Sequence, residues 1–394
     1  MESFSIISVR QIVEDMEDPE FFFYAKLYFK FHGFSLEING NNVLYKFWSI
    51  FNIMLQQTML MSLIYNVYDK YPDISIMVSY STVCFGLTVN SFKIMTVFKK
   101  IEKFGDFYRR MIGFWKFPLQ SEKFILMKHK SFTNVVSIVN FLSLIGGISW
   151  WVLLPPAISA YETYIIGSQN VTWITAYNVT YIKPFNTSPG YEISMTVYYL
   201  ITGFSVVGGC GFDSFFLESC FFISGHFQII QKRFERIKFD NIKSSIADIV
   251  EYQNEVIDAC ESLQDLLCSA IFPFLFFDSI VICTCLYTLL SVQTVTIMIA
   301  FIGITSAAVA QIFLLTYSGE VVAESSHGTL ESIYDSDWYS ALPSQRKYLI
   351  PCMMRARRGF KFKMVFFELL LTTLSMILQT AGSYFALLKT VSGN

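Results

Sequence analysis

Long runs without charged residues restrict most strongly how this chain of 394 residues folds. A helix that crosses a bilayer needs about 20 consecutive, mostly apolar residues. The run from Ser279 to Gly319 has 41 uncharged residues, which predicts two helices joined near residues 291–294. Other uncharged runs lie at 47–68, 74–92, 131–161, 193–212 and 369–388. We therefore predict an all-α polytopic membrane protein with seven transmembrane helices.

The composition agrees with a chain that lies largely in lipid. Charged residues make up 15% of it, against about 25% in ordinary soluble domains. The acidic N-terminus lacks the basic region and apolar core of a cleaved secretory signal, so we expect the first span to direct insertion. We predict one membrane domain over 1–394, with a cytoplasmic segment at 1–43. The transmembrane helices are expected at 44–68, 74–98, 131–156, 191–225, 266–291, 293–317 and 364–391.

Three N-x-[ST] sequons indicate which side of the membrane each loop occupies. Asn170, Asn178 and Asn186 all lie in the predicted loop 157–190. Sugars are attached to such sequons on the lumenal side, which later becomes the extracellular side. We therefore expect a glycosylated extracellular loop, a cytoplasmic N-terminus and an extracellular C-terminus.

Lysine and arginine residues give a second test of this orientation, because they accumulate on the cytoplasmic side. The segments predicted to be inside carry three before the first span, nine over 99–130, five over 232–243 and seven over 346–363. The outside segments carry three in all, and Lys46 and Lys93 lie within spans. The charge distribution therefore favours the same orientation as the sequons.

This orientation disfavours a G-protein-coupled receptor, which has seven spans but an N-terminus outside. The NPxxY signal typical of the last span in such receptors is missing, because no Asn precedes any of the ten prolines. All eight cysteines fall in predicted spans or cytoplasmic segments, so we expect no disulfide in the outer loops.

Motifs that would indicate an enzyme or a metal site are missing from the sequence. The four histidines are not paired at ligand spacing, and the chain has no HExxH, Cys-x-x-Cys or phosphate-cradling glycine motif. The glycine cluster at 208–211 is interpreted as a place of close helix packing. We expect no enzymatic activity, no metal and no cofactor.

Charged residues inside predicted spans are costly and usually face protein or water. Lys93 lies near the inner end of span two, and Asp213 and Glu218 lie in the inner half of span four. We expect Glu218 to be solvated beyond the membrane. Asp278 in span five is expected to pair with a cation or a hydroxyl group inside the bundle.

The C-terminal part of the chain resembles that of the insect odorant receptors. The matching elements are Gly319-Glu320, Ser325, the block IYDSDWY ending at Tyr339, and the Arg-Lys pair at 346–347. The run MRAR at 354–357 and the terminal SYF block beginning at Ser383 complete the pattern. The related gustatory receptors typically end in TYxxxxxQF, which this sequence does not match.

The resemblance implies a subunit of a ligand-gated, non-selective cation channel. In this family four subunits surround one pore, and odour-specific subunits assemble with a shared co-receptor that has a long insertion between spans four and five. That connection is short here, which favours a tuning subunit. The segment 320–362 is expected to be a cytoplasmic helical anchor that holds subunits together, with Trp338 as a packing centre.

The pore is expected along the outer part of the seventh span. Ser383, Leu387, Thr390 and Val391 share one face by the i, i+4 rule, and the resemblance places the family's gate at these positions. A ring of Leu387 side chains, with Val391 one turn further out, would close a water path by dewetting. Thr390 would offer a hydroxyl group to ions.

By resemblance, the odorant binds in the outer half of the bundle, among spans two, three, four and six. In span three, Ser143, Gly146 and Trp150 share a face at spacings of three and four. Such an arrangement suits an apolar ligand with one polar end, for instance an ester, an alcohol or a terpene-like molecule. Further candidates are Met77, Tyr80, Ser81, Tyr198, Thr202 and Ile297.

Two other functions remain open for a seven-span chain, namely a secondary transporter and a gustatory-type receptor channel. A transporter typically has internal repeats with broken helices, and we find no repeat. We expect the partners to be a small odorant, membrane lipid and the co-receptor in a heterotetramer, with no nucleic acid. The resemblance implies the plasma membrane of olfactory neuron dendrites.

Overall fold

The computed structural model describes residues 21–36, 43–69, 74–165, 190–237, 242–291 and 295–391. The three sequons at Asn170, Asn178 and Asn186 lie outside the described residues. In the described part the chain forms helices and no β-strand, apart from one isolated bridge between Lys363 and Glu368. The all-α prediction is confirmed.

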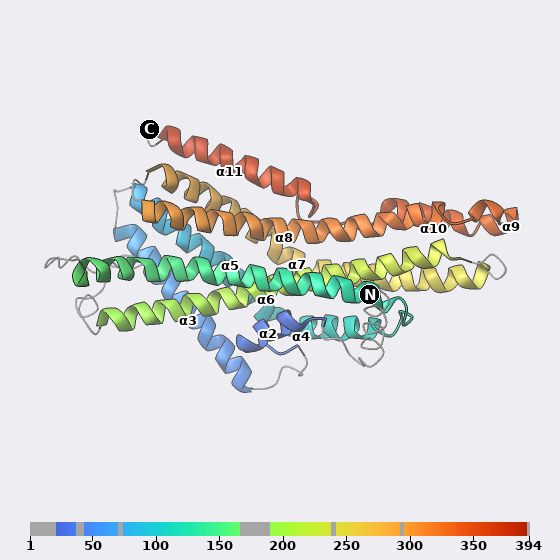
Figure 1. The fold of residues 1–394 in the computed structure, drawn as a ribbon, viewed down its shortest axis with the longest axis horizontal. Coiled ribbons are helices and arrows are strands. Elements are labelled where there is room, and N and C mark those ends of the chain that lie inside the picture. Colours follow the sequence, from blue (N-terminus) through green and yellow to red (C-terminus); the bar gives the residue numbers. More distant parts are fainter. Residues whose placement is uncertain are drawn as a thin grey trace, which may run out of the picture.

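Long helices form an elongated bundle (Figure 1). The helices that carry the predicted spans are α3 (Val43–Asp69), α4 (Ile74–Phe114), α5 (Lys123–Tyr164), α6 (Gly190–Glu235), α7 (Ile242–Ser291), α8 (Val295–Tyr334) and α11 (Leu371–Val391). Shorter elements are α2 (Phe23–Phe31), the 3-10 helix η3 (Trp338–Ser340), α9 (Pro343–Arg346) and α10 (Leu349–Arg358). The predicted division of the run 279–319 falls between α7 and α8.

Several helices are longer than the spans they contain. α7 begins at Ile242 and α8 ends at Tyr334, so both extend well past the predicted spans 266–291 and 293–317. In the described part, five helices are long and apolar enough to cross a membrane, namely α3, α4, α6, α7 and α8. Together they make a multi-pass membrane protein.

Helix α11 begins later than the predicted seventh span. Residues 363–370 are not helical and include the Lys363–Glu368 bridge with its bends, and α11 starts at Leu371. Leu369 donates its backbone N–H to the carbonyl of Phe362 at 2.9 Å. These local hydrogen bonds satisfy backbone groups that a helix would otherwise pair.

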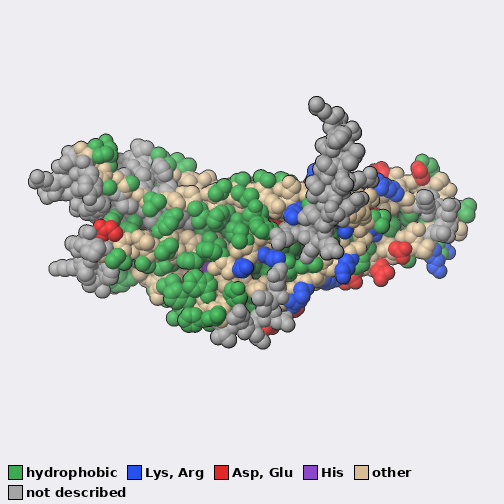
Figure 2. Space-filling view, turned by 60° about the horizontal axis from the view of Figure 1, so that its bottom comes forward, with side chains coloured by type: hydrophobic (Ala, Val, Ile, Leu, Met, Phe, Trp, Pro, Cys, Tyr) green, Lys and Arg blue, Asp and Glu red, His purple; other side chains and the backbone are tan. Residues whose placement is uncertain are grey.

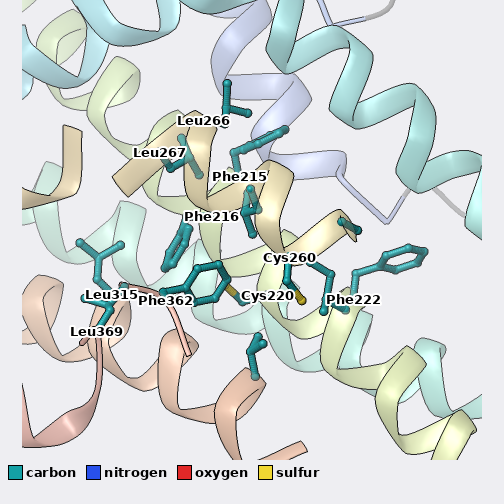
Figure 3. Close-up of a cluster of buried hydrophobic side chains, with 14 of the residues drawn as sticks. Phe215, Phe216, Cys220, Phe222, Cys260, Leu266, Leu267, Leu315, Phe362 and Leu369 are labelled. Atoms are coloured by element: carbon teal, nitrogen blue, oxygen red, sulfur yellow. The ribbon is translucent and has the colours of Figure 1, made fainter. Parts of the chain in front are cut away.

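Helix α6 is the central element of the core. Every residue from Ser205 to Phe227 is buried. Phe215 packs against Phe104 with ring centroids 4.9 Å apart, and Phe216 packs against Phe362 at 5.6 Å (Figure 3). Because α6 has neighbours on all sides, its apolar residues continue around the whole helix and not along one stripe.

The burial of α6 contradicts one expectation. Glu218 is 0% exposed and lies close to the backbone of Tyr24 and Ala25 in α2, so it is not solvated. The short α2 covers this part of α6, and the sequence of α6 alone carries no sign of that cover.

The glycine cluster at 208–211 allows this close packing. A Cβ atom on Gly208 would come within 2.6 Å of His32, and one on Gly211 within 2.7 Å of Phe29. On Gly209 it would overlap the Asn90 side chain. Glycine is therefore needed at three positions where α2 and α4 approach α6.

The surface divides into an apolar body and a charged end (Figure 2). Exposed apolar side chains include Phe47 at 69% and Leu142 at 60%. Basic and acidic side chains gather toward the end that carries α9 and α10. An apolar surface of this extent suits a lipid environment, and the charged end suits water.

Candidate functional site

Five helices, α4 to α8, line a partly open cavity of about 180 Å³. Its apolar lining comprises Val83, Leu87, Val89, Leu144, Val206, Val281, Ile304, Ala307 and Ala308. Its polar lining comprises Thr82, Asn90, Ser143, Thr202, Ser205, Asp278 and Gln311. A mostly apolar cavity with a few convergent polar groups is typical of a small-molecule site.

Glycine residues make room for the cavity. Gly86, Gly147 and Gly303 line it, one each on α4, α5 and α8. A Cβ atom built on any of the three meets no heavy atom within 4 Å in the described part of the chain. Larger side chains at these positions would therefore project into open space without displacing backbone.

Some polar groups of the lining are held by their neighbours. Gln56 of α3 donates a hydrogen bond to Ser205 Oγ at 2.6 Å. Thr202 Oγ1 donates to the carbonyl of Tyr198 at 2.8 Å. Such bonds fix the direction in which these hydroxyl groups face, so part of the polar surface is preorganised.

A buried ion pair lies beside the cavity. Lys93 Nζ donates to both carboxylate oxygens of Asp213, at 2.7 and 2.9 Å. Gln311, a lining residue, donates to the same carboxylate. Lys93 is 0% exposed and its ammonium group lies 3.9 Å from the centroid of the Phe274 ring. The Lys93 charge is therefore compensated inside the bundle, as a buried charge requires.

Asp278 differs from its acidic neighbour. It is 4% exposed and lines the cavity, and it interacts electrostatically with both Lys93 and Asp213. Its Oδ2 atom has no hydrogen-bond partner in the described part of the chain. The expected pairing of Asp278 with a cation or hydroxyl group is therefore not made by this oxygen.

The structure distributes the predicted ligand residues over several places. Ser143 and Thr202 line the cavity. Gly146 is exposed, and its neighbour Gly147 is the lining residue. Tyr198 lies outside the lining, with its hydroxyl 3.5 Å from Ser62 Oγ.

Three further predicted ligand residues do not line this cavity. Met77, Tyr80 and Ser81 lie on α4 before its first lining residue, and Ser81 Oγ donates to the carbonyl of Met77 at 2.8 Å. Trp150 and Ile297 belong to α5 and α8, but their side chains are outside the described part.

The predicted pore residues lie on an outer helix. α11 runs along the edge of the bundle (Figure 1), where Ser383 is exposed and Leu387 is 63% exposed. The hydroxyl groups of Ser383 and Thr390 donate to carbonyls of their own helix, at 3.0 and 2.6 Å. Val391 ends α11, and its side chain is outside the described part.

The sequence did not indicate that Asn90, Asp278 and Gln311 line the cavity. The signal for Asp278 was a lone carboxylate within an apolar span, which indicates a functional position in membrane proteins. Its direction toward α4, α6 and α8 depends on how the helices rotate as they pack, and the sequence alone does not give that rotation.

The helices and the cavity define a multi-pass membrane protein with a small, partly polar cavity in its bundle. Comparison with known families gives a more specific identification. A family model described as "7tm Odorant receptor" matches residues 73–382. The chain belongs to the odorant receptor family. Odorant receptors are not enzymes, so the expectation of no enzymatic activity is confirmed.

Relatives with curated names come from Drosophila melanogaster. Odorant receptor 22c is 29% identical over 193 residues, which cover 45% of this chain and 48% of that protein. Odorant receptor 10a is 24% identical over 295 residues, which cover 70% of this chain and 71% of that protein. The chain thus spans about half the length of the first relative.

Solved structures share the fold over nearly the whole chain. The olfactory receptor OR5 from Machilis hrabei, in complex with eugenol, superposes with a TM-score of 0.78 at 16% identity. That match covers 98% of this chain and 99% of the other. The same receptor without eugenol gives a TM-score of 0.77 at 18% identity. The fold is therefore that of an insect olfactory receptor.

Proposed function

We propose that this chain is the odour-specific subunit of a ligand-gated, non-selective cation channel. A volatile molecule binds in the cavity among α4 to α8, and binding opens a pore that α11 lines together with neighbouring subunits. The observation that carries this proposal is the cavity of about 180 Å³ that five helices of the bundle line. The eugenol complex of the similar Machilis hrabei receptor supports it.

The cavity has a size that suits a volatile molecule. An engineered apolar cavity of about 150 Å³ holds benzene, and drug-sized ligands occupy pockets of about 300 Å³ or more. Burying apolar ligand surface contributes about 25 cal/mol per Å². A ligand of about ten heavy atoms would gain several kcal/mol, enough to shift a two-state bundle if it binds the open state better.

Helix α8 connects the cavity to the proposed pore helix. Gly303 and Gln311 of α8 line the cavity, and further along the same helix Gly319 lies against the backbone carbonyl of Leu369. The next residue, Glu320, accepts a hydrogen bond from the first N–H of α11. A shift of α8 on ligand binding would therefore reach α11 directly.

The pore itself would form between subunits. α11 contacts α7 and α8, and its exposed Leu387 faces away from the chain's own core. In the proposed heterotetramer with the co-receptor, a ring of these leucines closes the conduit by dewetting. Segment 320–362 would anchor the subunits, with the half-buried Trp338 beside Tyr334 and Arg346.

The membrane orientation belongs to the same proposal. Seven crossings with the N-terminus inside would place the α9–α10 end in the cytoplasm and the sequons Asn170, Asn178 and Asn186 outside, at the plasma membrane of sensory neurons. The charged side chains around α9 and α10 support this arrangement (Figure 2). Loss of mass on enzymatic deglycosylation of intact cells would test the outer loop.

Whole-cell recording tests the function. Cells that express the chain with a co-receptor should pass cation current when a volatile panel is applied. Leu387→Ser should raise the current without ligand because the ring becomes wettable, whereas Leu378→Ser on the same helix should not. A receptor that gives no volatile-dependent current with any co-receptor would contradict the proposal, and currents limited to carrier turnover would favour a transporter.

A further inference from the structure

The wall of the cavity carries an acceptor without a partner in the described part of the chain. Asp278 is 4% exposed, lines the cavity and has an Oδ2 atom without a hydrogen-bond partner in the described residues. A buried carboxylate oxygen without a partner is costly. This oxygen of Asp278 does not stabilise the fold, so we take it as a sign that a ligand in the cavity supplies the missing hydrogen-bond donor.

Two donors of this region, on Lys93 and Gln311, are already engaged by another carboxylate. Lys93 Nζ donates to both oxygens of Asp213, and Gln311 Nε2 donates to the same carboxylate. The positive charge of Lys93 is thus matched by Asp213, and Asp278 adds a second acidic group to the same region. The cluster of Lys93, Asp213 and Asp278 therefore has one acidic group in excess, next to the open space.

We propose that the cavity selects volatile molecules that carry a hydrogen-bond donor, and that Asp278 accepts this hydrogen bond. The ligand class is a primary alcohol, a phenol or a primary amine with a small apolar body. The inference rests on the proposed function, because it places the ligand in the same cavity. It also narrows the expected ligands, since an ester or an ether has no donor for Asp278.

The size of the selectivity follows from the cost of an unmet acceptor. A site that hydrogen-bonds a hydroxyl or amino group rejects analogues that lack it more strongly than a site that only gains contact area. For a buried acceptor the difference corresponds to about tenfold to a hundredfold in affinity. Apolar residues such as Val281 and Ile304 would hold the body of either ligand equally.

Matched odorant pairs test the proposal in cells that express the chain with its co-receptor. Each primary alcohol from hexanol to decanol is paired with the methyl ether that has the same heavy atoms, for example 1-octanol with 1-methoxyheptane. The alcohol should activate at a concentration at least about tenfold lower than its ether. The activating concentration of octylamine, compared with that of 1-octanol, shows whether the site prefers a charged donor or a neutral one.

Variants of Asp278 assign the preference to this residue. Asp278→Leu should reduce the alcohol-to-ether ratio to near one, chiefly by weakening the response to the alcohol. Asp278→Asn keeps an acceptor oxygen and should lower the sensitivity to the amine more than that to the alcohol. Ile304→Val, at another lining position, should shift both members of a pair together. Surface biotinylation identifies any variant that fails to reach the membrane.

The outcomes separate this inference from the proposed function. Equal potency of alcohol and ether on the unsubstituted receptor would overturn the inference, as would activation only by volatiles without a donor. An unchanged ratio in an Asp278→Leu receptor that reaches the surface would also overturn it. Each of these results leaves an odorant-gated channel in place, whereas a receptor that no volatile activates contradicts the proposed function itself.

Discussion

Glu320 of α8 accepts a hydrogen bond from the backbone N–H of Leu371, the first residue of α11, with Oε2 and N 2.9 Å apart. The first N–H groups of a helix have no partner within the helix, and a carboxylate there also interacts favourably with the helix dipole. One side chain thus joins the helix that lines the cavity to the helix proposed to line the pore.

Removal of the Glu320 carboxylate is expected to weaken this junction. Glu320→Ala should lower the stability of the folded receptor by about 1–2 kcal/mol, since a lost helix cap has that effect. Glu320→Gln keeps an acceptor oxygen and should have a smaller effect. Thermal unfolding of detergent-solubilised receptor measures both. Glu324→Ala, on the exposed side of α8, is the control and should change little.

Gly319 should tolerate no side chain. A Cβ atom there would overlap the backbone carbonyl oxygen of Leu369, and backbone yields less readily than the end of a flexible side chain. Gly319→Ala is expected to reduce surface expression and odorant-evoked current more than Glu320→Gln does. Gly113→Ala has open space around its new methyl group and should be neutral or slightly stabilising. Equal surface expression of Gly319→Ala and Gly113→Ala would contradict the close packing at Gly319.

The Lys93–Asp213 pair predicts a strong coupling between two distant positions in the sequence. Lys93→Met leaves a buried carboxylate uncompensated and should cost about 3–5 kcal/mol. The double variant Lys93→Met/Asp213→Leu removes both charges and should recover much of that loss. A double-mutant cycle on thermal stability measures the coupling. Additive effects of the two substitutions would show that the pair does not act as a unit.

His32 makes the stability of the receptor depend on pH. Burial lowers the pKa of His32 to about 4, from a usual value of 6.5, because its ring is 1% exposed and stacks on Phe34. Between these two pKa values the unfolded chain binds more protons than the folded one. The contribution of His32 to stability is therefore complete above pH 6.5 and falls as the pH drops toward 4, by about 3 kcal/mol in all.

Thermal unfolding at a series of pH values from 7.5 to 4 tests this effect. His32→Phe should flatten the decline, because the buried ring no longer takes up a proton on unfolding. His327→Phe, at an exposed position, should leave the decline as it is. A decline of the same size in the His32→Phe receptor would assign the pH dependence to other groups.

The sequence predicted those parts of the fold that depend on residence in the membrane. Each predicted span lies largely within one of the long helices α3 to α8 and α11, because uncharged runs mark segments that can lie in a bilayer, against lipid or against other helices. Hydropathy does not mark where a helix ends once it leaves the membrane. Tyr334 and Ile242 therefore lie far beyond the predicted limits, in regions where polar residues continue the same helices.

Tertiary contacts account for what the sequence did not predict. Glu218 has the surroundings of a solvated residue in the sequence, but α2 folds back over it and buries it. In the cavity, Ser143 and Thr202 were foreseen and Asp278 was not, since the resemblance placed the ligand among four other helices. Which face of α7 lies at the cavity depends on how that helix packs against its neighbours along its whole length.

Two adjacent glycines of α5 show whether a volatile ligand occupies the cavity. Gly147 lines the cavity, Gly146 is exposed outside it, and a Cβ atom on either meets no described atom within 4 Å. Odorant-evoked whole-cell current is measured for Gly147→Leu and Gly146→Leu, each expressed with the co-receptor. We expect Gly147→Leu to fill the cavity and abolish the odorant-evoked current. Gly146→Leu should leave that current unchanged. A full response from Gly147→Leu, at normal surface expression, would contradict the account.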